Sequence, residues 1–192
     1  MKTIKTSICI AVLLTAVVML PASADEGPAY ERHPQALGIQ YGAISGSGLS
    51  YYRWSDNIGF QIALGGLYDP TGDISWMDIL DYSVGAELQY TVYGDSYAKW
   101  LAGQLYLFTG LNHRGVIERK PSDPNGDLET EAGPYIPSFT TGFGIGIEVV
   151  LFNHFSVPLE FGYAAAWKPS GASLQDQLAI KLITQAGFRY RF

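Results

Sequence analysis

Cysteine is almost absent from this sequence, and charged residues are few. The only cysteine is Cys9, and charged side chains make up 16% of the 192 residues. A single cysteine excludes an internal disulfide and a metal site built on several thiolates. Acidic side chains outnumber basic ones by eighteen to twelve. We therefore expect no nucleic acid partner, because phosphate backbones attract basic surfaces.

Long hydrophobic runs are also missing, apart from one near the N-terminus. Lys2 and Lys5 precede an apolar run at residues 8–20, and a small-x-small site ends at Ala24. This pattern predicts a signal peptide, residues 1–24, that is removed from the mature protein. The remaining 168 residues suit one domain. We expect a short periplasmic leader without packed structure at 25–36, and a single folded domain at 37–192.

Aromatic residues and glycine are abundant, and apolar residues alternate with polar ones. The chain has thirteen Tyr, nine Phe, four Trp and twenty-two Gly. Apolar residues recur at every second position in eight segments, a period of two that predicts strands. The expected strands are 37–44, 49–54, 58–68, 80–93, 97–110, 139–151, 155–167 and 178–192. In the fifth strand the phase is ambiguous, and we favour the leucine face outward.

The connections alternate in length. Those after the second, fourth and sixth strands span two or three residues, with turns at 55–57, 94–96 and 153–154. Those after the third, fifth and seventh strands are longer, and the longest runs from 112 to 135. An even number of strands with short turns at one end and longer loops at the other predicts an all-β, eight-stranded, antiparallel up-and-down β-barrel.

Alternation alone leaves open whether the apolar face points inward, as in a soluble lipocalin-type barrel, or outward, as in a membrane barrel. Gly142, Gly144 and Gly146 favour the second orientation. Eight strands leave an interior just wide enough for side chains, so small residues there make room for large polar ones. The opposite face, with Phe143 and Phe161 among its members, is too bulky for that interior. We therefore expect it to face lipid.

The inward face then carries the polar side chains. They are Gln40, Arg53, Gln61, Glu87, Gln89, Gln104, Glu148, Glu160, Lys181, Gln185, Arg189 and Arg191. Buried charges need opposite charges beside them. We predict an interior polar network of Arg53, Glu87, Glu148, Glu160, Lys181 and Arg189. Such a network either fills the barrel as a structural core or lines a gated conductive path.

The terminal strand and one hairpin carry a family resemblance. The chain ends on Phe188, Tyr190 and Phe192 in alternation, and residues 52–59 read YRWSDNIG. With the signal peptide and eight strands, the chain resembles small outer-membrane β-barrels of the opacity type and the transmembrane part of outer-membrane protein A. The resemblance implies outer-membrane localisation and contact with outer-membrane lipid. It also implies insertion by the barrel assembly machinery with periplasmic chaperones, and an insertion signal formed by the three terminal aromatics.

The resemblance implies membrane anchoring, surface interaction or a narrow pore, and we expect a structural or surface-interaction role first. A lipid A-modifying enzyme is a further alternative, because His154, Ser156 and Glu160 offer a base, a nucleophile and an acid. The acidic stretch 123–129 is only faintly like a calcium loop. We expect no cofactor, no metal and no catalytic residues. Apolar loop residues such as Trp76, Met77 and Ile79 do not specify an external ligand.

Overall fold

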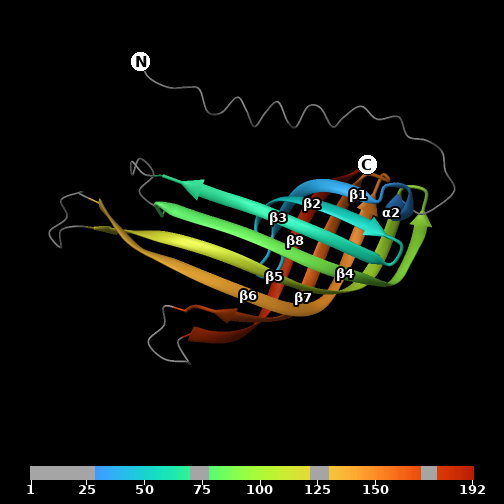
Figure 1. The fold of residues 1–192 in the computed structure, drawn as a ribbon. Helices are drawn as coiled ribbons and strands as arrows, with labels where there is room; N and C mark the ends of the chain where they lie inside the picture. Colours follow the sequence, from blue (N-terminus) through green and yellow to red (C-terminus); the bar gives the residue numbers. More distant parts are fainter. Residues whose placement is uncertain (1–28, 70–77, 122–129, 170–176) are drawn as a thin grey trace, which may run out of the picture.

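Eight antiparallel strands close into a single barrel (Figure 1). The structure is a computed structural model that describes residues 29–69, 78–121, 130–169 and 177–192. The strands are β1 Gln35–Tyr41, β2 Gly48–Ser55, β3 Ile58–Tyr68, β4 Leu80–Ala98, β5 Leu101–Pro121, β6 Thr130–Leu151, β7 Phe155–Trp167 and β8 Leu178–Arg191. Each strand pairs with its neighbours in sequence, and β8 pairs with β1. The predicted fold class is therefore confirmed, whereas the predicted signal peptide lies outside the described residues.

The strand register sets the width of the barrel. Followed residue by residue from Leu37 around the sheet, the pairing arrives at Ile180 on β8. Leu37 itself pairs with Tyr190, ten residues further along β8. This displacement requires tilted strands, typically by about 35–45°, and eight such strands enclose a space that side chains fill.

The two faces of the wall follow the predicted orientation. On β6 and β7 the aromatic residues and most of the large aliphatic ones point outward, and Phe143 is 66% exposed. Glu148 and Glu160, from the same two strands, are buried. On β5 Leu105 and Leu107 are exposed, while the intervening side chains are buried. The prediction that the leucine face of this strand points outward is confirmed.

Strand β4 continues through the predicted turn at 94–96. Gly94 and Ser96 pair with β5, and the chain reverses at residues 99–100 instead. A bulge between Thr91 and Tyr93 shifts the register by one residue. Because a bulge breaks the alternation of faces, the sequence pattern ends before the strand does.

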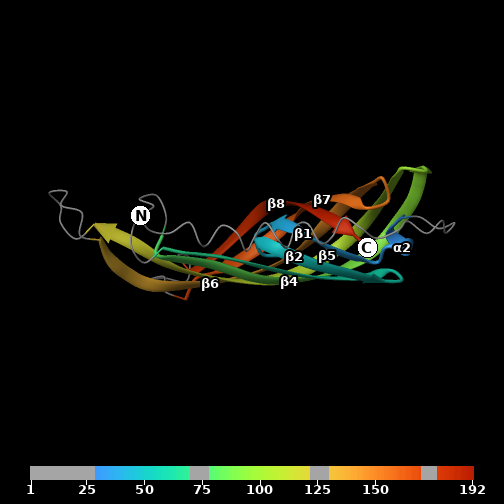
Figure 2. The ribbon, with the colours of Figure 1, turned by 90° about the horizontal axis from the view of Figure 1, so that it is seen from above.

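Most of the predicted connection 112–135 is also strand. The β5–β6 pairing extends beyond His113 and Phe139 as far as Pro121 and Thr130. Strand β7 stops opposite Phe139, so residues 130–138 of β6 have no described neighbour on their other side. Pro134 and Pro137 lie in this segment, where a missing backbone N–H is tolerated because the edge is free. Figures 1 and 2 show the β5–β6 hairpin extending past the other strands.

The segment before β1 is structured, in contrast to the predicted unpacked leader. Residues Ala29–Arg32 form one helical turn, α2, and β1 begins at Gln35. The Arg32 Nη2 donates to Asn153 Oδ1 at 3.0 Å, and the Trp54 backbone N–H donates to Pro34 O at 2.7 Å. These contacts fix the segment against the end of the barrel that carries the two- and three-residue turns, the short-turn end; the opposite end is the long-loop end.

Strand β1 ends at Tyr41, three residues earlier than predicted, and this shortens one side of the wall. The β1–β8 pairing stops at Tyr41 and Ala186, so no described strand covers the β1 side of residues 178–185. Leu182 on this segment is 71% exposed. At the long-loop end β1 and β2 therefore stop short of β8, and the barrel wall is shorter on that side.

The uncovered edge of β8 has a measurable consequence. Every second backbone N–H of an antiparallel strand points to the same neighbour. We expect alternate amides within 178–185 to exchange with deuterium much faster than those of 186–191, which pair with β1. Residue-resolved amide exchange of the protein in micelles measures this. Uniform protection along the whole of β8 would show that another segment covers the edge.

Candidate functional site

The centre of the interior holds Glu148 between two arginines of β8. The Arg191 Nη2 donates to Glu148 Oε2 at 2.6 Å, and the Arg189 Nη1 lies 3.7 Å from Glu148 Oε1. The Gln104 amide also donates to Glu148 Oε2, at 2.5 Å. All three charged side chains are fully buried. The pairing compensates the desolvation of each charge, which alone would cost several kcal/mol.

A second group of buried carboxyls has amide and phenol donors. Glu160 accepts hydrogen bonds from the Tyr106 hydroxyl at 2.7 Å and from the Gln185 Nε2 at 2.9 Å. Glu87 accepts from Gln89 Nε2 at 2.5 Å and from the same Gln185 nitrogen at 3.3 Å. Gln185 therefore bridges the two carboxyls, and the hydrogen bonds tie β4, β5, β7 and β8 together across the interior.

Arg189 connects the two groups. Its Nη2 donates to Gln40 Oε1 at 3.2 Å and to Gln61 Oε1 at 2.5 Å. Its guanidinium lies over the Tyr52 ring, 4.4 Å from the centroid, a cation–π geometry. The Tyr52 hydroxyl in turn donates to Gln89 Oε1 at 3.0 Å. The polar core thus spans every strand from β1 to β8.

Four of the six predicted network residues, Glu87, Glu148, Glu160 and Arg189, lie in this buried core. The inward orientation predicted for Arg53 is wrong. On β2 the buried face is formed by Ser50, Tyr52 and Trp54, so Arg53 between them points outward and is exposed. The rings of Tyr52 and Trp54 occupy the interior at this position of β2, where the charge of Arg53 was expected.

Lys181 is also outside the network. It lies on the same side of β8 as Gln185 and Arg189, but in the segment beyond the end of β1, where it is exposed. Its predicted ion pair is therefore not found among the residues that the structure describes. Arg191, which was placed inward but given no partner, provides the contact to Glu148 instead. Alternation with Phe188, Tyr190 and Phe192 signals its inward orientation.

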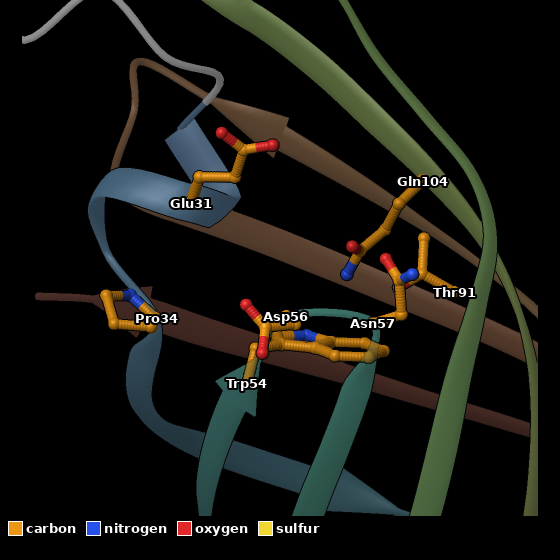
Figure 3. A pocket seen from close by; sticks show the side chains of 7 residues that line it. All are labelled: Glu31, Pro34, Trp54, Asp56, Asn57, Thr91 and Gln104. Carbon is orange, nitrogen blue, oxygen red and sulfur yellow. The ribbon is translucent and has the colours of Figure 1, made fainter.

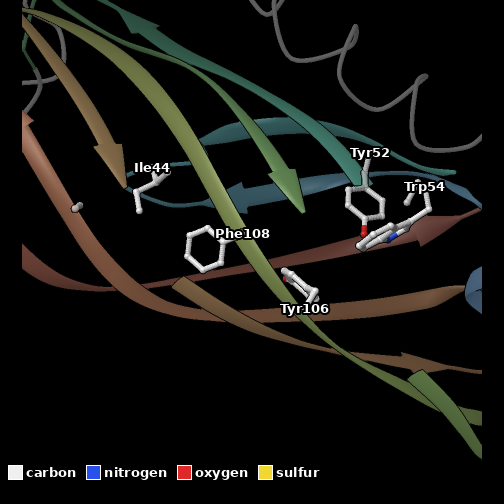
Figure 4. Packing of buried hydrophobic residues seen from close by; sticks show 7 residues of the cluster. Ile44, Tyr52, Trp54, Tyr106 and Phe108 are labelled. Atoms are coloured by element: carbon white, nitrogen blue, oxygen red, sulfur yellow. The ribbon is translucent and has the colours of Figure 1, made fainter. Parts of the chain in front are cut away.

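Aromatic side chains fill the interior beside the charges, an arrangement that the alternation of apolar and polar residues did not predict. The buried cluster contains Tyr52, Trp54, Tyr106, Phe108 and Ile44 (Figure 4). Glycines of the facing strands provide the space. A Cβ at Gly146 would lie 2.3 Å from the Tyr106 ring, and one at Gly59 would lie 2.9 Å from the Trp54 ring. The inward glycines therefore accommodate rings as well as polar chains.

The connection between β1 and β2, residues 42–47, folds into the long-loop end of the interior and is called the inner loop here. Ile44 and Ser45 are fully buried. The Gln185 Oε1 accepts hydrogen bonds from the Ile44 N–H at 2.7 Å and the Ser45 N–H at 3.1 Å. Asn112 Nδ2 donates to Ala43 O at 3.2 Å, so the loop is attached to both β8 and β5.

At the short-turn end a cavity of about 400 Å³ opens beside α2 (Figure 3). Its lining includes Glu31 from α2, Trp54 from the end of β2, Asp56 from the β2–β3 turn and Gln104 from β5. Gln104 also donates to Glu148, so this side chain separates the cavity from the charged centre of the barrel.

His33 lies in the leader, next to Pro34 of the cavity lining. Its ring centroid is 4.5 Å from that of His154. Burial, followed by the positive charges of His154, Arg32 and Arg191, lowers the pKa of His33 below 6.5. Protonation of His33 therefore favours the detached state of the leader, in which the pKa of His33 is near 6.5.

We expect the leader to be held fully at pH 7.5 and to loosen as the pH falls below about 6.5, towards the lower pKa of His33 in the attached state. Limited proteolysis and amide exchange of residues 29–34 at pH 7.5 and pH 5.5 measure this. His33→Gln should abolish the difference. Equal protection of the wild-type leader at both pH values would contradict the assignment.

The residues of the enzyme hypothesis do not form a triad. His154 uses Nδ1 to donate to the Arg191 carbonyl at 2.9 Å, and its ring stacks on Tyr190. Ser156 and Glu160 are buried inside the barrel. Within the described ranges no hydrogen bond joins His154 to Ser156, and no group of three or more His, Cys, Asp or Glu side chains suits a metal ion. The acidic stretch 123–129 and the loop residues Trp76 and Met77 lie outside the described residues.

Together these features define the class as a small eight-stranded up-and-down β-barrel with a charged interior and an apolar outer surface. The N-terminal β-barrel domain of OprF from Pseudomonas aeruginosa, known from a crystal structure, is similar to it. The TM-score is 0.46 at 10% sequence identity, covering 82% of this chain and 95% of that domain. No family model matches the sequence, and the search of curated proteins found no match.

Proposed function

We propose that the chain is an integral outer-membrane barrel with a closed interior, whose role is structural or in surface interaction. The observation that carries this proposal is the inversion of the usual burial pattern. Phe143, Tyr163 and Ile180 are exposed, whereas Glu148 and Arg189 are fully buried. Large apolar patches rarely face water, so this outer surface fits lipid.

The spacing of the outer aromatic residues supports a membrane span. At the long-loop end Phe139 stacks on Trp167, and at the short-turn end Phe155 stacks on Phe188. Strand β7 runs from Phe155 to Trp167. At about 3.3 Å per residue and a tilt of about 40°, these positions lie roughly 30 Å apart along the barrel axis. This matches the hydrocarbon thickness of a bilayer, with aromatic residues at both interfaces.

No helix in the described ranges is long and apolar enough to cross a bilayer. In the closed part of the barrel the backbone groups pair between neighbouring strands, which is the requirement in hydrocarbon. The terminal aromatics Phe188, Tyr190 and Phe192 lie on the final strand, which closes the ring against β1. Their role as an insertion signal, and the assembly machinery as a partner, are part of this proposal.

The extended part of β4, β5 and β6 would form the surface presented outside the membrane. There Arg114 and Asp81 form a two-pronged ion pair, with Nε to Oδ1 at 2.8 Å and Nη2 to Oδ2 at 2.5 Å. The Tyr82 hydroxyl contacts both His113 Nε2 at 2.9 Å and the Tyr135 hydroxyl at 2.6 Å. These interactions stiffen a sheet on which a partner could bind.

Single-tryptophan variants in bilayers test the membrane span. Trp100 and Trp167 are about half exposed on the outer surface, whereas Trp54 is 5% exposed and faces the interior. Lipids brominated on the acyl chains should quench Trp167 and leave Trp54 almost unaffected. Equal quenching of the two, or a protein that stays dissolved without detergent, would refute the proposal.

Planar-bilayer recordings test the closed interior. The inner loop and the Glu148 contacts both lie across the axis, so we expect no steady conductance. Discrete, reproducible conductance that changes on Glu148→Ala would instead establish a narrow pore.

A further inference from the structure

We propose that Glu87 and Glu160 bind one proton between them, and that this proton keeps the inner loop, residues 42–47, inside the barrel. Loss of the proton at alkaline pH would release the loop and admit water at the long-loop end. The proposal rests on the closed interior proposed above and adds the condition under which it opens. Its basis is the charge of the buried groups, the donors that the two carboxyls share, and one amide that contacts both carboxyls and the loop.

The buried carboxyl groups outnumber the buried cations. Glu87, Glu148 and Glu160 are at most 1% exposed, whereas Arg189 and Arg191 are the only fully buried cations in the described ranges. Both guanidinium groups lie at Glu148, and no ion pair among the described residues includes Glu87 or Glu160. A buried charge without a counter-charge is strongly unfavourable. One bound proton makes the five groups neutral together.

The two carboxyls lie side by side, because they share the same donors. Gln89 Nε2 donates to Glu87 Oε1 at 2.5 Å and to Glu160 Oε1 at 3.2 Å. Gln185 Nε2 donates to Oε2 of both, at 3.3 Å to Glu87 and at 2.9 Å to Glu160. Glu87 is also in direct hydrogen-bond contact with Glu160. Two carboxyl groups bond to each other only when one of them carries a proton, and two carboxylates this close repel each other.

Apart from the two arginines, the groups around the pair are neutral or acidic. The Tyr106 hydroxyl and Gln40 Nε2 donate to Glu160, at 2.7 Å and 3.4 Å. The other ionisable groups that face the pair are Tyr52 on β2, Tyr106 on β5, Glu148 on β6, and Arg189 and Arg191 on β8. Amide N–H groups point at the carboxyl oxygens and would repel a metal ion, and the described ranges hold no group of three or more His, Cys, Asp or Glu suited to one. A proton fits where a metal ion does not.

Gln185 connects the acid pair to the inner loop. While its Nε2 bridges the two carboxyls, its Oε1 accepts from the N–H groups of Ile44 at 2.7 Å and Ser45 at 3.1 Å. Gln40 makes a second connection, because its Nε2 donates to Glu160 Oε2 at 3.4 Å and to Ser45 Oγ at 3.2 Å. When the proton leaves, repulsion moves the two carboxylates apart, and one amide can no longer bridge them while it holds the loop. The loop then loses its attachment to β8 and β1.

Infrared spectroscopy detects the proton directly, because a protonated carboxyl has a carbonyl stretch distinct from that of a carboxylate. The folded chain is measured at pH 7 in micelles of an alkyl maltoside, a detergent without carbonyl groups. We expect the band of a protonated carboxyl in the wild type. Glu87→Gln and Glu160→Gln should each abolish the band, because two carboxylates then face two guanidinium groups. Asp95→Asn is the matched control on β4, where Asp95 is exposed, and should leave the band unchanged.

Thiol labelling tests the connection to the inner loop. A chain with Cys9→Ser and Ser45→Cys carries one thiol on this loop. It is compared with the same chain carrying Glu87→Gln, at the same pH, so that ionisation of the thiol affects both alike. With iodoacetamide at pH 7 both should react slowly. At pH 10 the chain that keeps Glu87 should react at least about tenfold faster, because only its acid pair can lose a proton and open the loop.

Three results would overturn the proposal: no protonated carboxyl in the wild type at pH 7, a band that survives both substitutions, or equal labelling of the two chains at pH 10. These measurements in micelles do not depend on a membrane span. Failure of the proposed function would be seen elsewhere, as equal quenching of Trp54 and Trp167 by brominated lipid or as steady conductance at neutral pH.

Discussion

Glu148→Ala is expected to destabilise the barrel by about 3–5 kcal/mol, because it leaves Arg189 and Arg191 buried without their carboxylate. Both guanidinium groups are fully buried, and the Arg191 contact to Glu148 is 2.6 Å long. The Gln104 amide would lose its acceptor as well. Denaturant unfolding in detergent or lipid, followed by tryptophan fluorescence, measures the loss.

Two variants separate the causes of this effect. Glu148→Gln keeps the volume but removes the charge, so we expect it to retain most of the destabilisation. Arg53→Ala removes an arginine that points outward, and its effect should stay within about 0.5 kcal/mol, as at other exposed sites. If Glu148→Ala and Arg53→Ala were equally mild, Glu148 would not be the counter-charge of the core.

Gly85→Ala is expected to displace the inner loop and to reduce stability by about 3 kcal/mol, the upper part of the range for overpacking. A Cβ at position 85 would lie 2.3 Å from the carbonyl oxygen of Ser45 and 2.5 Å from the N of Gly46. These are backbone atoms, which cannot rotate away as a side chain can. Gly46 itself has a φ of 86°, a conformation that strongly favours glycine.

Labelling detects the displacement directly. Since Cys9 is the only cysteine, a chain with Cys9→Ser and Ser45→Cys carries one thiol in the inner loop. A water-soluble maleimide should label it slowly in the parent and at least tenfold faster with Gly85→Ala. Gly66→Ala is the control, because its nearest contact is the Tyr82 Cβ at 3.3 Å. Unchanged labelling and stability in Gly85→Ala would show that the loop is not packed against β4.

The limits of two strands that begin at short turns were predictable, because both the alternation and the turn residues are features of neighbouring positions in the sequence. Strands β3 and β7 have the predicted limits, 58–68 and 155–167. The edges of the other elements were less predictable. A bulge near Thr91 changes the phase of β4. Pairing with β5 extends β6 through Pro134 and Pro137, two residues that in a sequence pattern indicate a loop.

The sequence by itself determined that eight alternating segments close into a barrel and that the glycine-rich face points inward, because a narrow interior admits few large side chains. Only the tertiary structure decided which charges meet. Arg191, and not Arg53 or Lys181, reaches Glu148. Arg53 is on the outer face, because Tyr52 and Trp54 occupy the interior, whereas Lys181 is on the inner face but at the wrong height along the axis. Alternation assigns a side chain to a face, but its height along the axis depends on the ten-residue displacement around the ring and on where β1 ends. Those quantities are set by pairing between strands that lie far apart in the chain.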